Sequence, residues 1–364
     1  MSRIITFLGR GSDQITLSVA TAHWFAQRGS RVLLMTHHPS ADAEILLETP
    51  LTTTPQDVAP NFQAVQLQTT TLLDQAWDEL KQWLTMYLPD AIAVEVYPHE
   101  MMILPGFDSA LTFNALRHYH ESGRYDVLVY HGCGDLNTLR LLGLPNILEW
   151  YFRRAQGAAS LDLSRIAESV GGPLAGALVS ANLDNRKLQE GMDQVRAWLN
   201  QTQAMTGQSC LSAYLITTDD PGSIGNAQWL WGSAQQVGIS VNGVLVYGGN
   251  SNADRSKIQQ PFDPLTVNWL PTLGASRWDP LLNALPNFNA QPSLPPPVAI
   301  DIAQRQVQVF LPGFAKHQVR LTQTGSELTV EAGDQRRNIV LPAELQGQTV
   351  TAGKFEAPYL TISL

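Results

Sequence analysis

The chain has 364 residues, of which 44% are hydrophobic and 15% are charged. That balance excludes a disordered chain, which would be rich in charge and poor in apolar residues, and at about 150 residues per domain the length suggests two domains. A net charge of −9 argues against a general nucleic-acid-binding protein, whose surface is usually basic.

The two cysteines, Cys133 and Cys210, are too few for a disulfide framework or a CxxC zinc site. We therefore expect a protein of the reducing cytoplasm. No apolar run approaches the ~18 residues of a transmembrane helix, and the N-terminal apolar stretch is too short for a signal peptide.

The first part of the chain alternates strand-like with helix-like segments. Buried strands are expected at 3–8, 31–35, 125–130, 213–217 and 241–247, with helices at 14–28, 72–87, 110–121 and 227–236. This alternation predicts an α/β domain with a mainly parallel sheet and helices on both faces. The stretch of about 150–206 has no clear strand, so we expect a helical insertion there.

The composition changes near residue 285. The stretch 286–297 holds five prolines, and consecutive prolines favour a stiff, extended linker. Beyond it, short alternating runs are separated by turn signals such as Pro312-Gly313. This pattern predicts an all-β sandwich over 298–364, after an α/β domain over 1–285.

The turn after the first strand, FLGRGSDQITLS at 7–18, bears most directly on function. A strand, a glycine-bearing loop and a helix start can bind phosphate, because loop N–H groups and the helix N-terminus point at the anion. Against the Walker A pattern G-x-x-x-x-G-K-[ST], Gly9 and Thr16 fit, whereas Gln14 and Ile15 replace the second glycine and the lysine. Alone, this motif favours an ordinary strand-turn-helix.

Four blocks in order resemble the ATPase family of the arsenite pump and the tail-anchored-protein targeting factor. GRGSDQITL at 9–17 is similar to that family's loop GKGGVGKTT, and LLMTHHPSA at 33–41 to its LLxSTDPAHS. PGFDS at 105–109 resembles its PGxDE segment, and YDVLVYHGCGDLNTLRLLGLP at 125–145 resembles its switch II strand. The resemblance covers about 1–285 and implies a P-loop NTPase-type fold.

The departures from the family fall on the positions that do chemistry. By the resemblance, the P-loop lysine is Ile15, the signature lysine is Arg10, and the two switch aspartates are His38 and His131. Because phosphoryl transfer depends on positioning and charge stabilisation, each loss matters, and Asp13 adds a negative charge to the loop. The resemblance thus implies a degenerate phosphate loop, with ATP or ADP and Mg²⁺ bound weakly or not at all. The loop comprises Gly9, Arg10, Gly11, Ser12, Asp13, Gln14, Ile15 and Thr16.

Two alternatives stay open for the loop. Arg10 could hold a phosphate through two hydrogen bonds, and with Thr16 and the loop backbone it would serve a slow or atypical ATPase. Otherwise Arg10 and Asp13 simply pair on a surface turn. The family's adenine-reading asparagine corresponds, in a looser alignment, to Tyr247.

The histidines also allow two interpretations. His38 and His131, joined by the neighbouring His37, would lie at the carboxyl ends of central strands, where α/β proteins bind ligands. With Cys133 they could form a transition-metal site. The alternative, which we favour, is that histidine fills positions where carboxylates are no longer needed, with no metal bound.

The segment 298–364 resembles the α-crystallin domain of small heat-shock proteins. The matching blocks are LPGFAKHQVRLTQTGSELTVEAG at 311–333, RRNIVLP at 336–342 and FEAPYLTISL at 355–364. The resemblance implies an immunoglobulin-like β-sandwich. We expect it to act as an intramolecular docking or dimer module rather than as a free chaperone.

In the targeting branch of the ATPase family, a methionine-rich helical insertion lines a groove for a hydrophobic client. By that resemblance, the groove candidates here are Met101, Met102, Leu188, Met192, Val195 and Leu199. Methionine suits promiscuous apolar surfaces, although ordinary helix packing would also explain these residues. We expect an ATPase-fold protein that binds a hydrophobic or protein client in a chaperone-like or targeting role. A slow ATPase is the alternative, and a homodimer would need a surface other than the family's paired cysteines.

Overall fold

The computed structural model describes residues 2–9, 11, 13–37, 41–87, 106–157, 197, 201–202, 205–207, 210–249, 254–274, 278–290, 292 and 294–364. The chain divides into two compact units. The larger unit comprises Met1–Gln66, Tyr119–Gly143 and Thr206–Leu364, and the smaller one comprises Leu67–His118 and Leu144–Met205. None of the helices within the described residues is long and apolar enough to span a membrane.

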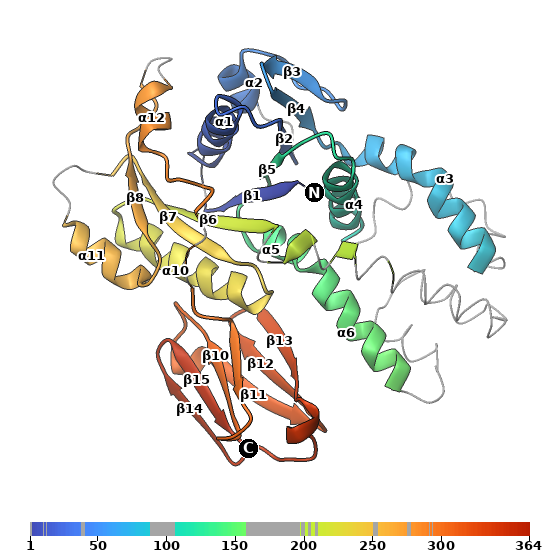
Figure 1. The fold of residues 1–364 in the computed structure, drawn as a ribbon, viewed down its shortest axis with the longest axis vertical. Helices are drawn as coiled ribbons and strands as arrows, with labels where there is room; N and C mark the ends of the chain where they lie inside the picture. The colour runs from blue at the N-terminus through green and yellow to red at the C-terminus, as the bar shows by residue number, and fades with distance from the viewer. Residues whose placement is uncertain are drawn as a thin grey trace. The chain divides into compact units, whose positions relative to one another are not determined.

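The larger unit contains an eight-stranded sheet in the order β3-β4-β2-β5-β1-β6-β7-β8 (Figure 1). Only the β3–β4 pair is antiparallel. The central strands are buried nearly throughout, which explains their continuous apolar sequences. The strands are β1 (Arg3–Leu8), β2 (Val32–Thr36), β3 (Gln56–Ala59), β4 (Phe62–Gln66), β5 (Val127–His131), β6 (Leu211–Thr217), β7 (Val241–Tyr247) and β8 (Val267–Leu270).

Helices cover both faces of this sheet. Strand β2 lies on one side of β1, and β7 lies on the opposite side of β6. Since such crossovers are right-handed, α1 (Asp13–Ala26) and α10 (Pro221–Gln236) lie on opposite faces (Figure 1). The mainly parallel α/β fold is therefore confirmed. The remaining helices of this unit include α2 (Ala41–Leu47), α5 (Leu136–Leu142), α11 (Arg255–Gln259), the 3₁₀ helix Gln260–Phe262 and α12 (Asp279–Ala284).

The core under α1 extends past the last helix of the sheet domain. Phe288 is fully buried, and its ring centroid lies 5.4 Å from that of Trp24, 5.8 Å from Phe25 and 5.0 Å from Tyr214. Phe288 falls within the stretch expected to be an extended linker. The chain thus stays packed on the sheet domain through this residue.

The smaller unit contains helices α3 (Thr69–Tyr87), most of α4 (Phe107–Glu121) and α6 (Leu144–Gly157). The expected insertion at about 150–206 lies mostly outside the described residues. All six groove candidates (Met101, Met102, Leu188, Met192, Val195 and Leu199) also lie outside them.

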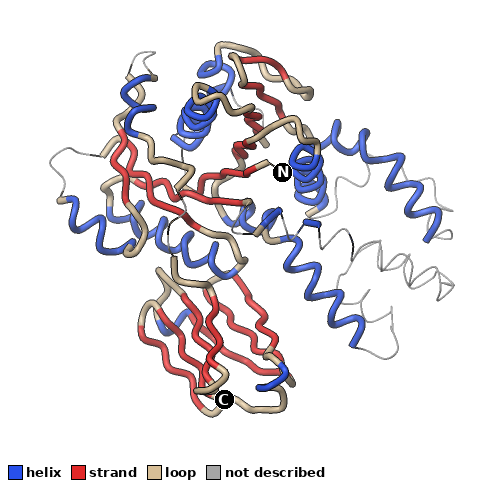
Figure 2. The backbone as a smooth tube through the Cα atoms, viewed as in Figure 1, coloured by secondary structure: helices blue, strands red, loops and turns tan. Residues whose placement is uncertain are grey.

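The C-terminal segment forms the expected β-sandwich, almost all of it strand and turn (Figure 2). A four-stranded sheet in the order β14-β15-β10-β9 packs on a three-stranded sheet β11-β12-β13, and the strand pairs are antiparallel. Residues from both sheets share one apolar core. The strands are β9 (Val298–Asp301), β10 (Gln306–Phe310), β11 (Val319–Thr324), β12 (Glu327–Ala332), β13 (Gln335–Val340), β14 (Ala352–Glu356) and β15 (Tyr359–Ser363).

Candidate functional site: a closed phosphate loop

The loop after β1 is fixed by close contacts at Gly9. Its N–H donates to the carbonyl of Gly134, with an N–O distance of 2.8 Å. A Cβ atom at Gly9 would lie 2.7 Å from the carbonyl oxygen of Ile216, so no larger residue fits there. Gly9 is therefore held between the end of β6 and the segment that follows β5.

Gln14 fills the position where a Walker loop has its second glycine. Its side chain is 4% exposed, and its Nε2 donates to the carbonyl of Phe7 at 2.9 Å. A Cβ atom at Gly134 would overlap the Gly9 carbonyl and lie 2.8 Å from both amide atoms of Gln14. The Gln14 amide thus packs between Phe7 and Gly134, and we call the loop closed in this sense.

The next two residues, Ile15 and Thr16, differ in burial and in polarity. Ile15 is 3% exposed and belongs to the apolar core between α1 and the sheet. The residue that the resemblance aligns with the P-loop lysine is thus part of the core and carries no charge. Thr16 is half-buried in the first turn of α1 and retains its hydroxyl. Arg10 and Ser12 lie outside the described residues.

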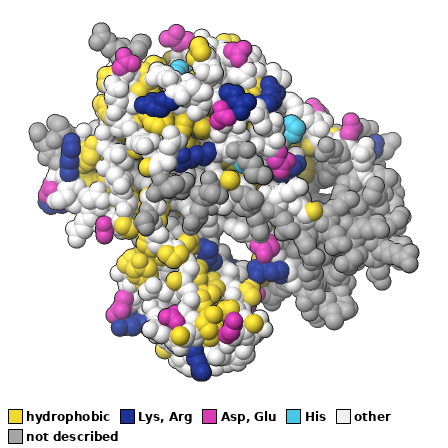
Figure 3. Space-filling model, in the orientation of Figure 1, with side chains coloured by type: hydrophobic (Ala, Val, Ile, Leu, Met, Phe, Trp, Pro, Cys, Tyr) yellow, Lys and Arg dark blue, Asp and Glu magenta, His cyan; other side chains and the backbone are white. Residues whose placement is uncertain are grey.

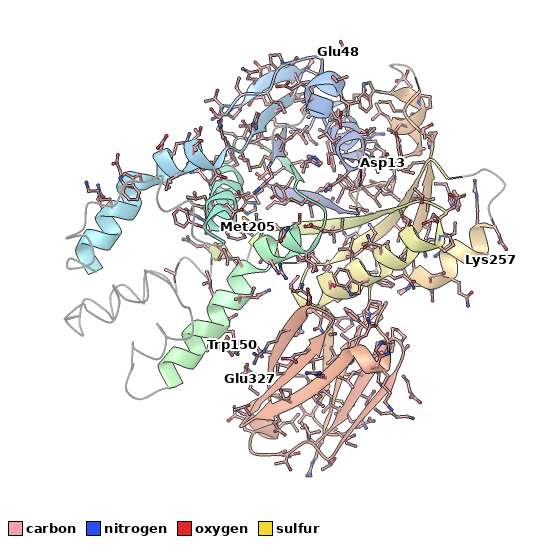
Figure 4. All side chains as sticks on the ribbon, turned by 180° about the vertical axis from the view of Figure 1, so that it is seen from behind. Asp13, Glu48, Trp150, Met205, Lys257 and Glu327 are labelled. Atoms are coloured by element: carbon pink, nitrogen blue, oxygen red, sulfur yellow. The ribbon has the colours of Figure 1, made fainter. Side chains whose placement is uncertain are left out.

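Asp13 opens α1 at the loop (Figure 4). Burial raises the pKa of this carboxyl above its ordinary value. Burial also raises the pKa of Tyr247, and the nearby charge of Asp13 adds to that shift. The Tyr247 hydroxyl accepts a hydrogen bond from the N–H of Leu273 at 2.9 Å. An acidic side chain therefore stands at the first position of α1, close enough to Tyr247 to affect its pKa.

His131, which the resemblance aligns with a switch aspartate, is the last residue of β5, and His37 directly follows β2. His37 donates its N–H to the carbonyl of His131 at 3.0 Å, and its Nδ1 lies 3.1 Å from the Tyr130 hydroxyl. Cys133 is exposed, and His38 lies outside the described residues. Among the residues that are described, no three His, Cys, Asp or Glu side chains are arranged to hold a metal ion.

Sequence reasoning singled out the loop but missed Gly134 and Ile216, which close it. Gly134 has a φ of +66°, a conformation that favours glycine. The sequence feature that could have pointed to Gly134 was the pair of glycines on either side of Cys133. Nothing in the sequence indicates that Ile216 contacts Gly9, because the two residues meet only through the pairing of β1 with β6.

Two family models match this chain, one over the α/β part and one over the β-sandwich. The model of the anion-transporting ATPase family, ArsA, matches residues 2–258. The chain belongs to this ArsA family. A second model, for the HSP20-like domain found in ArsA, matches residues 303–364. Both predicted resemblances are confirmed.

Several curated proteins are similar to this ArsA-family chain. An arsenical pump-driving ATPase of Chlorobaculum tepidum is 30% identical over 149 residues, an alignment that covers 41% of this chain and only 37% of that protein. The arsenical pump-driving ATPase 1 of Aquifex aeolicus is 18% identical over 99% of both chains. An ATPase ASNA1 homologue of Babesia bovis is 29% identical over 39% of this chain and 37% of its own length.

Proposed function

We propose that this chain is a client-binding member of the ArsA family whose phosphate loop no longer holds a nucleotide. The proposal is supported by the closed loop, in which Gln14 packs between Phe7 and Gly134, and by the buried, uncharged Ile15 at the position that the resemblance gives to the lysine. The client is a hydrophobic segment or another protein, and the role is chaperone-like or one of targeting.

The energetics of the loop support the loss of nucleotide binding. A phosphate needs N–H donors and a cation, but the residue that the resemblance aligns with the lysine is the buried, uncharged Ile15. A carboxylate about 4 Å from a phosphate oxygen costs roughly 1 kcal/mol in water and about 4 kcal/mol near a protein surface. Asp13 therefore opposes a triphosphate when it is ionised, and nothing at position 15 offsets it.

The client-binding part rests on two supports. The first is the resemblance to the targeting branch of the family. Its groove positions correspond to Met101, Met102, Leu188, Met192, Val195 and Leu199. The second is the apolar surface of the sandwich (Figure 3), where Ile300, Ile302 and Val340 remain 38%, 47% and 44% exposed. The proposal includes a cytoplasmic location, which low cysteine usage supports. It is also compatible with a homodimer.

One observation favours a second candidate, a slow or atypical ATPase. Thr16 stands at the position of the Mg²⁺-binding hydroxyl, in the first turn of α1. Arg10 would then supply the charge that Ile15 lacks. This candidate requires the Gln14 side chain to leave its hydrogen bond with Phe7.

Calorimetric titration of the full chain with Mg-ATP, Mg-ADP and metal-free ATP separates the two candidates. We expect no binding at millimolar nucleotide. Micromolar binding would refute the closed-loop proposal and support the ATPase. Thr16→Ala would then be compared with the natural chain in a turnover assay, because loss of the hydroxyl should abolish Mg²⁺-dependent hydrolysis.

A further inference from the structure

Two helices start beside the Gly9 loop and end at the β-sandwich. Strands β5 and β6 flank β1 in the sheet, and each is followed by a helix, α5 and α10. Since parallel strands end at one edge of a sheet, both helices begin at the edge where the loop lies (Figure 1). The sheet and the sandwich belong to one compact unit.

The second half of α10 is buried on all sides, since every residue from 230 to 237 is buried. The helix packs on β6 and β7 and also on β12 and β13. Trp229 packs against the sandwich core. A Cβ atom at Gly232 would overlap the Pro312 carbonyl and the Phe314 ring. The helix therefore completes the core of the sandwich.

Three further contacts hold the sandwich to the two helices. The backbone of Gly313, at φ +76°, lies directly against that of Gln228. Arg337 donates from Nη1 to the carbonyl of Gln235. On α5, Arg140 Nη2 lies 3.9 Å from a carboxylate oxygen of Asp334, in the β12–β13 turn. The sandwich thus contacts α10 from Gln228 onward and α5 at Arg140. We call this contact the seam.

At the other end, both helices are joined tightly to the loop. Ser223 Oγ lies 3.0 Å from Thr217 Oγ1 and accepts the N–H of Thr218 at 3.1 Å, which ties α10 to the end of β6. On α5, the N–H of Gly134 donates to Thr138 Oγ1 at 3.0 Å. Because Gly134 and Ile216 both contact Gly9, the loop is braced from each helix.

The seam also contains groups that docking leaves unsatisfied. Gln335 Nε2, two residues before Arg337 on β13, is buried with no hydrogen-bond partner among the described residues. The same is true of Gln235 Oε1 on α10. Unpaired buried polar groups favour opening, because water would satisfy them. The seam is therefore tightly packed, but docking leaves these two buried polar groups without a hydrogen bond.

We propose that the β-sandwich is a clamp whose docking on α10 and α5 holds the Gly9 loop closed, so that release of the sandwich loosens the loop. Packed elements shift between discrete arrangements rather than deform smoothly. A coupling of this kind is reciprocal, so a disturbed loop must also weaken docking. The proposal does not depend on whether a nucleotide binds.

The test uses a wedge at the seam with a matched control. Gly313→Ala places a methyl group against the Gln228 backbone, whereas Gly325→Ala, also in the sandwich at φ +58°, meets nothing within 4 Å. Hydrogen–deuterium exchange of the full chain is measured at the loop, residues 9–16 and 132–138. We expect the wedge to speed loop exchange about tenfold and the control to leave it unchanged.

The reverse experiment uses a second pair of glycines. Gly134→Ala collides with Gly9 and Gln14, whereas Gly123→Ala, at the similar φ of +67°, meets nothing within 4 Å. We expect the first change to speed exchange around Gly333 and Arg337 at the seam.

Trp229→Ala serves as a second seam variant if the wedge misfolds. Unchanged loop exchange in a variant with an open seam overturns the proposal. The proposal is also overturned if exchange at the seam stays slow in both Gly313→Ala and Trp229→Ala. The contacts of Gly313 and Trp229 would then not be what holds the sandwich on α10.

Discussion

One hydrogen bond links the turn after β1 to the turn after β5, from the N–H of Gly9 to the carbonyl of Gly134 at 2.8 Å. The Gln14 amide packs against the same Gly134 and donates to the carbonyl of Phe7 at 2.9 Å. The contacts of Gly134 and Gln14 thus tie the start of α1 to the ends of β1 and β5.

This arrangement predicts a gain of function. In Gln14→Gly/Ile15→Lys the Gln14 side chain, the plug of the loop, is removed and a lysine replaces the core residue Ile15, so we expect Mg-ATP to bind below millimolar concentration, where the natural chain shows no binding. Calorimetric titration measures the change. Gln14→Gly alone is the control, because it opens the loop without adding charge. Equal affinity in the natural chain and the double variant would show that the plug does not govern binding.

A second prediction concerns the aromatic cluster around Phe288. Phe288→Ala removes a fully buried ring that contacts Trp24, Phe25 and Tyr214. We expect it to lower the free energy of unfolding by about 3–5 kcal/mol, as measured by urea denaturation. Asn289→Ala, at the exposed neighbouring position, should change stability by less than about 0.5 kcal/mol. Similar effects of the two changes would mean that this stretch is a loose linker.

Much of the fold was predictable because its signals are local. The strand at 241–247 lies where its apolar run predicts. The helix expected at 227–236 begins earlier, at Pro221, because Asp220 caps it through the N–H of Ser223 at 2.9 Å. The sequence leaves 222–225, with its two glycines, open between a turn and a helix start, and the structure shows the helix. The edge strands β3 and β8 and the neighbouring strand β4 were missed, because all three are short and β3 and β8 are only partly buried.

The candidate site was less predictable, because its contacts join distant parts of the chain. The resemblance predicts that Ile15 replaces the P-loop lysine, and this assignment stays a prediction. The sequence could not show that Gln14 folds back onto Phe7, nor that Gly134 and Ile216 pack on Gly9. Such contacts follow from strand order, which composition and spacing do not determine.

The last prediction concerns pH and His120, near the end of α4. Its side chain is 3% exposed, its Nδ1 has no hydrogen-bond partner among the described residues, and burial lowers its pKa below the ordinary value. The unfolded chain therefore binds a proton more readily than the folded one, so stability is full above about pH 6.5 and falls as the pH drops below it.

Replacing this histidine should remove that dependence. We expect His120→Asn to flatten the slope of unfolding free energy between about pH 6.5 and pH 5, by at most about 1.4 kcal/mol per pH unit. Urea denaturation at several pH values gives the slope. His118→Asn, at an exposed position on the same helix, should keep the natural slope. If both variants flatten it equally, the pH dependence arises from general surface charge and not from the buried His120 ring.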